Sequence, residues 1–152
     1  MARYINEILQ PDEKIVFATT IHWMIYLPGI AMWIATAAIY FIGSQSATPQ
    51  LWMMSAIAVG LIAAFMTFRA WFRRWTTEID VTDRRIVFKR GFIRRHTVEM
   101  NMDKVESVDV DQSILGRIFD FGDIIVRGTG AGIEPLHNIQ APLKFRNYVT
   151  AR

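Results

Sequence analysis

The chain has 152 residues, of which 52% are hydrophobic and 20% are charged, and its formal net charge is +3. It contains no cysteine, which excludes disulfide bonds and thiolate metal sites. The charges are unevenly spread, because no Asp, Glu, Lys or Arg occurs between Lys14 and Arg69. A chain of single-domain length therefore consists of a short N-terminal segment, an uncharged third and a charged C-terminal half.

The N-terminal segment, residues 1–22, ends in the β-branched run EKIVFATTIHW. Residues of this type favour strands. We interpret the run as an additional strand of the C-terminal domain or as a linker to the apolar third, and we expect the segment to be cytoplasmic.

Two apolar runs, 23–42 and 51–68, are joined by the polar turn 43–50. Twenty helical residues cover about 30 Å, which matches the hydrocarbon core of a bilayer. A buried helix of a soluble protein is the alternative for either run alone. Two such runs in tandem, joined by so short a loop, favour a transmembrane helical hairpin over residues 23–68.

A cleaved signal peptide is a further interpretation of the first run, because Ala35-Thr36-Ala37 resembles a cleavage site. The preceding segment is net acidic, however, and the apolar run continues past this site. Both features disfavour cleavage.

The distribution of arginines around the hairpin predicts its orientation. The turn 43–50 has no Lys or Arg, whereas Arg69, Arg73 and Arg74 follow the second run within an aromatic-rich linker, residues 69–75. The positive-inside rule then places this linker and both chain ends in the cytoplasm, with the arginines at the level of the lipid phosphates. The residues expected in the aromatic belts at the two interfaces are Trp23, Trp52, Trp71, Phe72 and Trp75.

The C-terminal half, residues 76–152, changes to the two-residue period of half-buried strands. Ile79 and Val81 alternate with polar residues, and similar short runs recur as far as residue 139. Val105 is out of phase with its run, which predicts a β-bulge. Pro142 marks the start of a short C-terminal helix. The sequence therefore predicts a small antiparallel sheet or barrel closed by a helix.

The run VESVDVDQSILGRIFDFGDIIV, together with TDRRIV before it, resembles the bacterial pleckstrin-homology (PH) membrane proteins of the YdbS-like group. Its most specific part is Gln112–Gly122, in which Asp120 stands where many relatives carry glycine. The hairpin at 23–68 and the opening Glu13-Lys14-Ile15 are also similar to that group, so the resemblance covers nearly the whole chain.

This resemblance implies an α+β membrane protein: a two-helix transmembrane hairpin followed by a PH-like, strongly bent seven-stranded sheet with a short C-terminal helix. It also implies a multi-pass protein of the bacterial inner membrane, without established catalytic residues. Members of the group are expected to associate with themselves or with other membrane proteins. PH domains that bind lipids use loops between their first strands.

Charge is divided within the C-terminal half. Residues 69–95 hold nine Lys or Arg against three acids, and residues 96–126 hold seven acids against two basic residues. A basic face near a bilayer attracts anionic headgroups by about 1 kcal/mol per residue. The alternative is a set of solvated strand charges. The candidate headgroup or interface residues are Arg69, Arg73, Arg74, Arg84, Arg85, Lys89, Arg90, Arg94 and Arg95.

The acidic block is interpreted as a solvated face or as a surface that meets the basic block of a second copy. The glycines of GTGAG, residues 128–132, lack the full dinucleotide fingerprint and favour a turn. No His, Asp or Ser constellation has metal-site or catalytic spacing. We therefore expect no metal, cofactor, nucleic acid or catalytic residue.

The sequence thus favours a membrane-anchored binding or scaffold module that docks lipid headgroups or protein partners and assembles with copies of itself. The alternatives are an accessory subunit of a transport, secretion or stress-response complex and, less favoured, a membrane enzyme.

Overall fold

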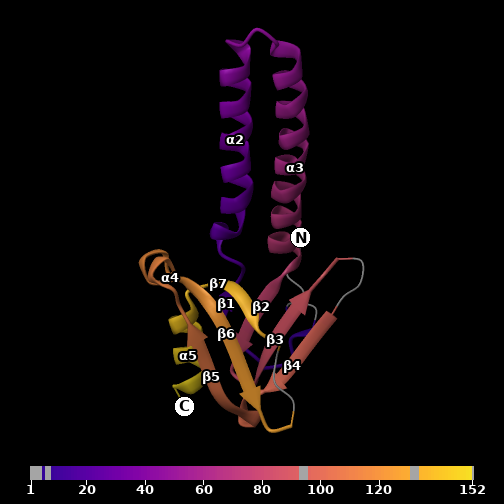
Figure 1. Ribbon diagram of the computed structural model, residues 1–152. Helices are drawn as coiled ribbons and strands as arrows, with labels where there is room; N and C mark the ends of the chain where they lie inside the picture. Colours follow the sequence, from indigo (N-terminus) through magenta and orange to yellow (C-terminus); the bar gives the residue numbers. More distant parts are fainter. Residues whose placement is uncertain (1–4, 6–7, 93–95, 131–133, 152) are drawn as a thin grey trace. The chain divides into compact units, whose positions relative to one another are not determined.

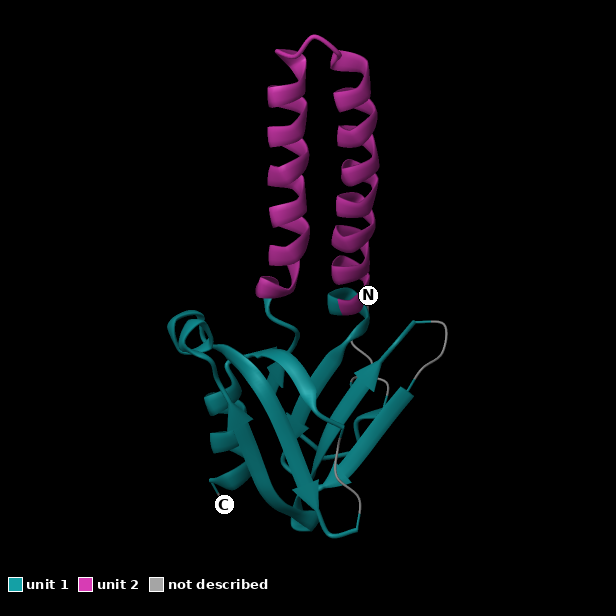
Figure 2. Ribbon diagram, in the orientation of Figure 1, with its two compact units in different colours: residues 1–22, 74–152 teal, residues 23–73 magenta. Residues whose placement is uncertain are grey.

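A computed structural model of the protein describes residues 5, 8–92, 96–130 and 134–151 (Figure 1). The chain divides into two compact units (Figure 2). The hairpin unit comprises residues 23–73, and the β unit comprises residues 1–22 together with 74–152. The N-terminal segment and the C-terminal half therefore form one folded body, and the hairpin is an insertion within it.

The hairpin unit begins with a 3-10 turn, η1 (Trp23–Tyr26), and continues as helix α2 (Leu27–Ser44). Helix α3 (Pro49–Thr76) returns antiparallel to it and extends into the β unit (Figure 1). Residues 69–75, expected as a linker, are helical, because the run RAWFRRW contains no glycine, no proline and no capping residue that would end the helix. A helix of 28 residues is about 42 Å long, which exceeds one bilayer core.

The two long helices pack through small residues. A Cβ added to Gly43 would overlap the side chain of Trp52, and one added to Gly29 would lie 2.7 Å from Thr67 Oγ1. The Thr67 hydroxyl accepts a hydrogen bond from Trp33 Nε1 at 3.2 Å and donates one to the carbonyl of Ala63 at 2.8 Å. These contacts join α2 to α3 while most of the remaining apolar side chains of both helices face outward.

The β unit contains two antiparallel sheets. The first has the strand order β1-β2-β3-β4, and the second has the order β5-β6-β7. The strands of the first sheet are β1 (Ile15–Thr19), β2 (Glu78–Thr82), β3 (Arg85–Arg90) and β4 (His96–Asn101). The 3-10 turn η2 (Met102–Lys104) leads to the second sheet. The second sheet consists of β5 (Val105–Asp111), β6 (Phe121–Gly128) and β7 (Leu136–Gln140). Helices α4 (Ile114–Phe119) and α5 (Pro142–Thr150) complete the unit.

The strand expected at the end of the N-terminal segment is present, and it pairs with β2. Thr19 lies opposite Ile79, and Ile15 lies opposite Thr82. The hairpin unit is therefore inserted between two strands that are direct neighbours in the sheet. The pairing of β1 with β2 holds the two ends of the insertion together.

The core of the β unit is formed by both sheets and by α5. Ile124, Val126 and Phe145 are completely buried, and α5 packs against β1, β2, β5 and β6. The expected alternation of buried and exposed residues is not found in β2. Its residues 79–82 are all buried, because both faces of this strand are covered. The bulge predicted at Val105 is confirmed by a register shift between Val105 and Ser107 in the pairing of β5 with β6.

Candidate functional site

The basic residues predicted to form one face are divided between the two ends of β3. Arg84 and Arg90 are both exposed, but Arg84 precedes the strand and Arg90 is its last residue. Arg85 and Arg90 are five positions apart in the strand, which corresponds to about 17 Å. Glu78, at the start of β2, lies opposite Lys89. Arg90 therefore lies at the end of the sheet where α3 enters, and Arg84 lies at the opposite end.

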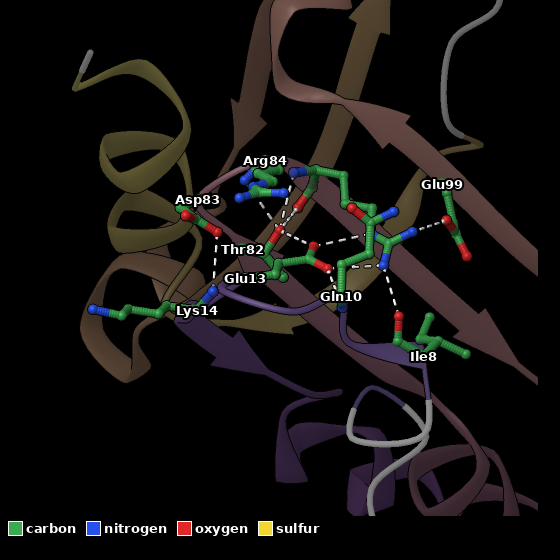
Figure 3. A network of polar contacts seen from close by, with 9 residues as sticks. Ile8, Gln10, Glu13, Lys14, Thr82, Asp83, Arg84 and Glu99 are labelled. Carbon is green, nitrogen blue, oxygen red and sulfur yellow. Dashed lines mark hydrogen bonds and ion pairs between the residues drawn. The ribbon is translucent and has the colours of Figure 1, made fainter.

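Arg85, predicted as a headgroup or interface residue, is engaged with partners inside the β unit. Its Nη1 donates to Glu99 Oε2 at 2.8 Å, and its Nη2 donates to the carbonyl of Ile8 at 2.9 Å. Its Nε and Nη2 also donate to the two carboxylate oxygens of Glu13, at 3.0 and 2.9 Å. The Arg85 side chain is only 13% exposed, so its guanidinium is enclosed by these partners. Figure 3 shows Ile8, Glu13 and Glu99 gathered in this network of the β unit.

Glu13 is the centre of this network, and only its position in the family-like opening drew attention to it in the sequence. Its side chain is 1% exposed, and it accepts hydrogen bonds from Arg85, from the Thr82 hydroxyl at 2.7 Å and from the backbone N–H of Gln10 at 2.9 Å. Burial raises the pKa of Glu13, but these hydrogen bonds and the charge of Arg85 outweigh it and lower the pKa to about 2. The same contacts raise the pKa of Arg85.

Lys89 is also engaged within the sheet. Its Nζ lies 3.9 Å from Glu78 Oε1, and its side chain is 17% exposed. Of the four basic residues of the β2–β3 hairpin, Arg84 and Arg90 are thus the exposed pair. Arg94 and Arg95 lie outside the described residues.

The hairpin joins the β unit at a region that we call the hairpin end, residues 20–22 and 74–77. The Thr20 hydroxyl donates to the carbonyl of Thr77 at 3.2 Å, which links the two connections directly. Strand β7 supports the first of them: His22 N donates to Asn138 O at 2.7 Å, and Gln140 N donates to Thr20 O at 3.1 Å. Both chain connections to the hairpin therefore start from one place in the β unit.

Exposed aromatic rings accompany the basic residues at the hairpin end. The rings of Trp75 and Phe92 lie 5.5 Å apart, and these residues are 43% and 53% exposed. Phe92 follows Arg90 by two residues, so both belong to the same end of β3. Trp75 was predicted as a belt residue, whereas Phe92 was not, although an aromatic residue between basic pairs is a signal that would have found it.

The other predicted belt residues lie in the hairpin unit. Trp23, Trp52 and Trp71 are 43%, 39% and 48% exposed, and Phe72 is half-buried. Arg69 is exposed, and Arg73 is half-buried, in the last turns of α3. Arg74, also half-buried, belongs to the β unit.

His22 is 5% exposed at the hairpin end, and its ring stacks on Phe121 with the centroids 5.2 Å apart. Burial lowers the pKa of His22, the charge of Arg74 lowers it further, and Asp120 opposes both. This contact places the start of β6, which directly follows α4 and Asp120, at the hairpin end.

The α4 loop explains the polar residues of the specific motif. Ser113 Oγ accepts from Gly116 N at 3.1 Å, and Gln112 Nε2 donates to the carbonyl oxygens of Gly116 and Phe121 at 3.3 and 3.1 Å. A Cβ on Gly116 would lie 2.5 Å from Phe121 O. Asp120 has φ 57° and ψ 51°, a left-handed conformation that glycine adopts without strain. The backbone at this position therefore suits glycine better than an aspartate.

Several aspartates considered for a cation have partners of their own. Asp109 Oδ2 lies 3.1 Å from Arg127 Nε, and Asp123 accepts from Asn138 N and contacts His137 Nδ1 at 2.7 Å. Among the residues that the structure describes, no group of three or more His, Asp or Glu is placed to hold a metal ion.

Residues 15–152 match the family model of the bacterial PH domain. The chain belongs to the bacterial PH domain family. Comparison with curated proteins and with solved structures gave no match. Membership of the narrower YdbS-like group stays a prediction.

The family assignment gives the insertion a functional context. Lipid-binding PH domains were expected to use loops between their first strands, and in this PH domain the β1–β2 connection is the hairpin itself. A headgroup pocket built by a short β1–β2 loop therefore cannot form here.

Proposed function

We propose that this bacterial PH domain is a membrane-anchored binding module whose hairpin crosses the bilayer and whose hairpin end contacts anionic headgroups. The supporting observation is the exposure of the two long helices. Their most apolar windows have mean hydropathies of 1.8 and 2.0, yet only 6% and 11% of these windows is buried in the protein. A helix in the core of a soluble domain is largely buried, so these side chains require another apolar environment.

The direction of insertion follows from charge. The turn between α2 and α3 has no basic residue, whereas Arg69, Arg73 and Arg74 lie at the other end of the hairpin. This asymmetry favours the β unit in the cytoplasm. Both connections leave the β unit at the hairpin end, so this end is the part closest to the headgroups along the chain.

The lipid contact proposed here involves fewer residues than the sequence suggested. Arg69, Arg73, Arg74 and Arg90 are close along the chain or the sheet to the hairpin end and are retained. Arg84 lies at the opposite end of β3, and Arg85 and Lys89 are engaged with acidic partners. Binding without catalysis is part of the proposal.

Cysteine labelling tests the topology, because the natural chain has no cysteine. Two variants are treated with a membrane-impermeant maleimide in cells with a permeabilised outer membrane. They are Ala47→Cys, in the turn of the hairpin, and Thr129→Cys, in the β unit. We expect labelling of Ala47→Cys alone, and of Thr129→Cys only after lysis. Labelling of Thr129→Cys in intact cells would refute the orientation.

The lipid contact is tested in nanodiscs that contain spin-labelled phosphatidylglycerol. Replacing Arg69, Arg73 and Arg90 by Gln should reduce the motionally restricted lipid fraction at low salt, with a smaller difference at high salt. The matched control is Arg84→Gln, which removes an exposed charge from the far end of β3. A loss from Arg84→Gln that reaches one third of the loss from the triple variant would show that only net charge matters.

Self-association is a second proposal, favoured by a groove of about 540 Å³ between α2 and α3. It is lined by Trp33, Tyr40, Ala56 and Gly60 among others. Small residues such as Ala56 and Gly60 permit close helix approach. The internal pairing of Asp109 and Asp123 weakens the earlier argument from opposed charge blocks. The mass of the particle in mild detergent distinguishes a homo-oligomer from a monomer and from an accessory subunit bound to another protein.

A further inference from the structure

Helix α4 carries an apolar surface that the fold does not cover. Four of its six residues form what we call the apolar tip: Ile114, Leu115, Ile118 and Phe119, which are 80%, 54%, 68% and 43% exposed. Single exposed apolar side chains are common on soluble proteins, but four within one six-residue helix form a continuous patch. The helix projects from the strands of the β unit (Figure 1).

The loop is held rigidly without the apolar tip. Gln112 and Ser113 bond the two ends of α4, and Gly116 allows the close approach of the Phe121 carbonyl. These contacts use polar side chains and backbone atoms and involve none of the side chains of Ile114, Leu115 and Ile118. A rigid frame that displays apolar side chains indicates a binding surface.

The apolar tip lies at the hairpin end of the β unit. Phe121, two residues after Phe119, stacks on His22, and His22 immediately precedes the first residue of the hairpin unit. Asp120 is fixed there too, because its carbonyl accepts from Ala141 N at 2.9 Å, next to the contact of Gln140 with Thr20. This location is set by contacts inside the β unit alone.

We infer that the apolar tip inserts into the interfacial layer of the bilayer, as a second lipid contact of the PH domain. The inference rests on the proposed function, since it needs the hairpin in the membrane. A lipid surface is favoured as the occupant because Trp75 and Phe92 are exposed at the same end and Arg117 is exposed within α4. This mixture of apolar, aromatic and arginine side chains suits the headgroup boundary. Exposed Asp120 limits insertion to that shallow layer.

The test uses the full chain in nanodiscs of phosphatidylethanolamine and phosphatidylglycerol, with one environment-sensitive fluorophore at a time. Ile118→Cys reports on the apolar tip, and Leu115→Cys is a second position on it. Thr129→Cys is the matched control, because it follows the opposite end of β6, about 25 Å along the strand. Ile57→Cys, 57% exposed in α3, reports on the hairpin. The quenchers are lipids with a nitroxide at a shallow or a deep position.

We expect the labels at positions 118 and 115 to be quenched roughly twofold or more by the shallow nitroxide, as for an interfacial helix. The label at 129 should not be quenched, and the label at 57 should respond to the deep nitroxide. Suppose that the label at position 57 is quenched, while the labels at 118 and 115 stay unquenched like the label at 129. The inference is then wrong and the proposed function stands. If 57 is not quenched, the proposed function itself fails.

A second copy of the chain is the competing occupant, and the same labels detect it. In that case the emission at 118 would shift to the blue without lipid quenching, and the shift would disappear when each nanodisc holds one chain. That result would overturn the inference. Quenching at 118 that persists with one chain per nanodisc supports it.

Discussion

The carboxylate of Glu13 is bonded by the guanidinium of Arg85, Oε1 to Nε at 3.0 Å and Oε2 to Nη2 at 2.9 Å. These residues are 72 positions apart, and the whole hairpin unit lies between them in the chain. The pair therefore joins the N-terminal segment to β3 across the insertion. It stabilises the sheet that holds both ends of the hairpin together.

Replacing Glu13 by Gln should destabilise the β unit at neutral pH by about 2–3 kcal/mol, because it leaves the buried guanidinium of Arg85 without its main counter-charge. Denaturant unfolding of the full chain in mild detergent measures this loss. Glu106→Gln, at an exposed position of β5, is the matched control and should change the free energy of unfolding little. Equal effects of the two substitutions would contradict the role of Glu13.

The lowered pKa of Glu13 predicts that the free energy of unfolding depends on pH in the acid range. The pKa of Glu13 in the folded protein is about 2, below its usual 4.5, so its ionisation stabilises the fold above pH 4.5. That contribution is lost as the pH falls from 4.5 towards 2. Unfolding free energies measured across this window should fall more steeply in the natural chain than in Glu13→Gln. Parallel curves would show that other carboxyl groups are responsible.

The backbone of Asp120 predicts a stabilising substitution. Asp120→Gly should raise the free energy of unfolding by up to about 1 kcal/mol, because glycine adopts a φ of 57° without the steric cost of a side chain. Asp120→Ala removes the same charge but keeps a Cβ, and it should not stabilise. Thermal unfolding of the two variants separates the backbone effect from the charge effect. An equal gain in stability for both variants would refute the explanation from the backbone.

Gly116→Ala should disrupt the α4 loop, since its Cβ would lie 2.5 Å from the Phe121 carbonyl oxygen. The expected cost is about 1–3 kcal/mol, as for other overpacked sites. Hydrogen exchange at residues 113–121 should rise locally. Unchanged protection of this segment would show that the loop can shift to accept the methyl group.

The packing of the hairpin unit predicts a contrast between two glycines. Gly43→Ala should lower the thermal stability of the helices in detergent, because the added methyl group overlaps Trp52. Gly60→Ala should be tolerated, because its Cβ would meet Thr36 Cγ2 at an ordinary 3.4 Å. Helical circular dichroism during heating measures both. Similar midpoints for the two variants would contradict the packing described here.

Local patterns in the sequence predicted much of the fold. The apolar runs predicted α2 and most of α3, the two-residue period predicted the strands after residue 76, and the phase slip at Val105 predicted the bulge. Each of these depends on residues close together in the chain. Helix α4 was missed because its signal is six residues long and its N-cap, Ser113, was read only as part of a family motif.

The surroundings of the candidate basic residues could not be predicted from the sequence. Arginine content alone cannot separate exposed Arg90 from Arg85, whose partners Glu13 and Glu99 come from other strands and from the N-terminal segment. Arg84 and Arg90 lie at opposite ends of β3. A count of the charges in residues 69–95 does not reveal this separation.

Composition and periodicity by themselves determined that this protein has two apolar helices of bilayer length and a small β domain, because hydropathy and strand period are properties of neighbouring residues. Only the tertiary structure decided that the hairpin is inserted between two paired strands, that Arg85 is enclosed, and that Phe121, two residues after the apolar tip, stacks on His22. Those features depend on contacts between residues far apart in the chain, which arise only when both sheets assemble.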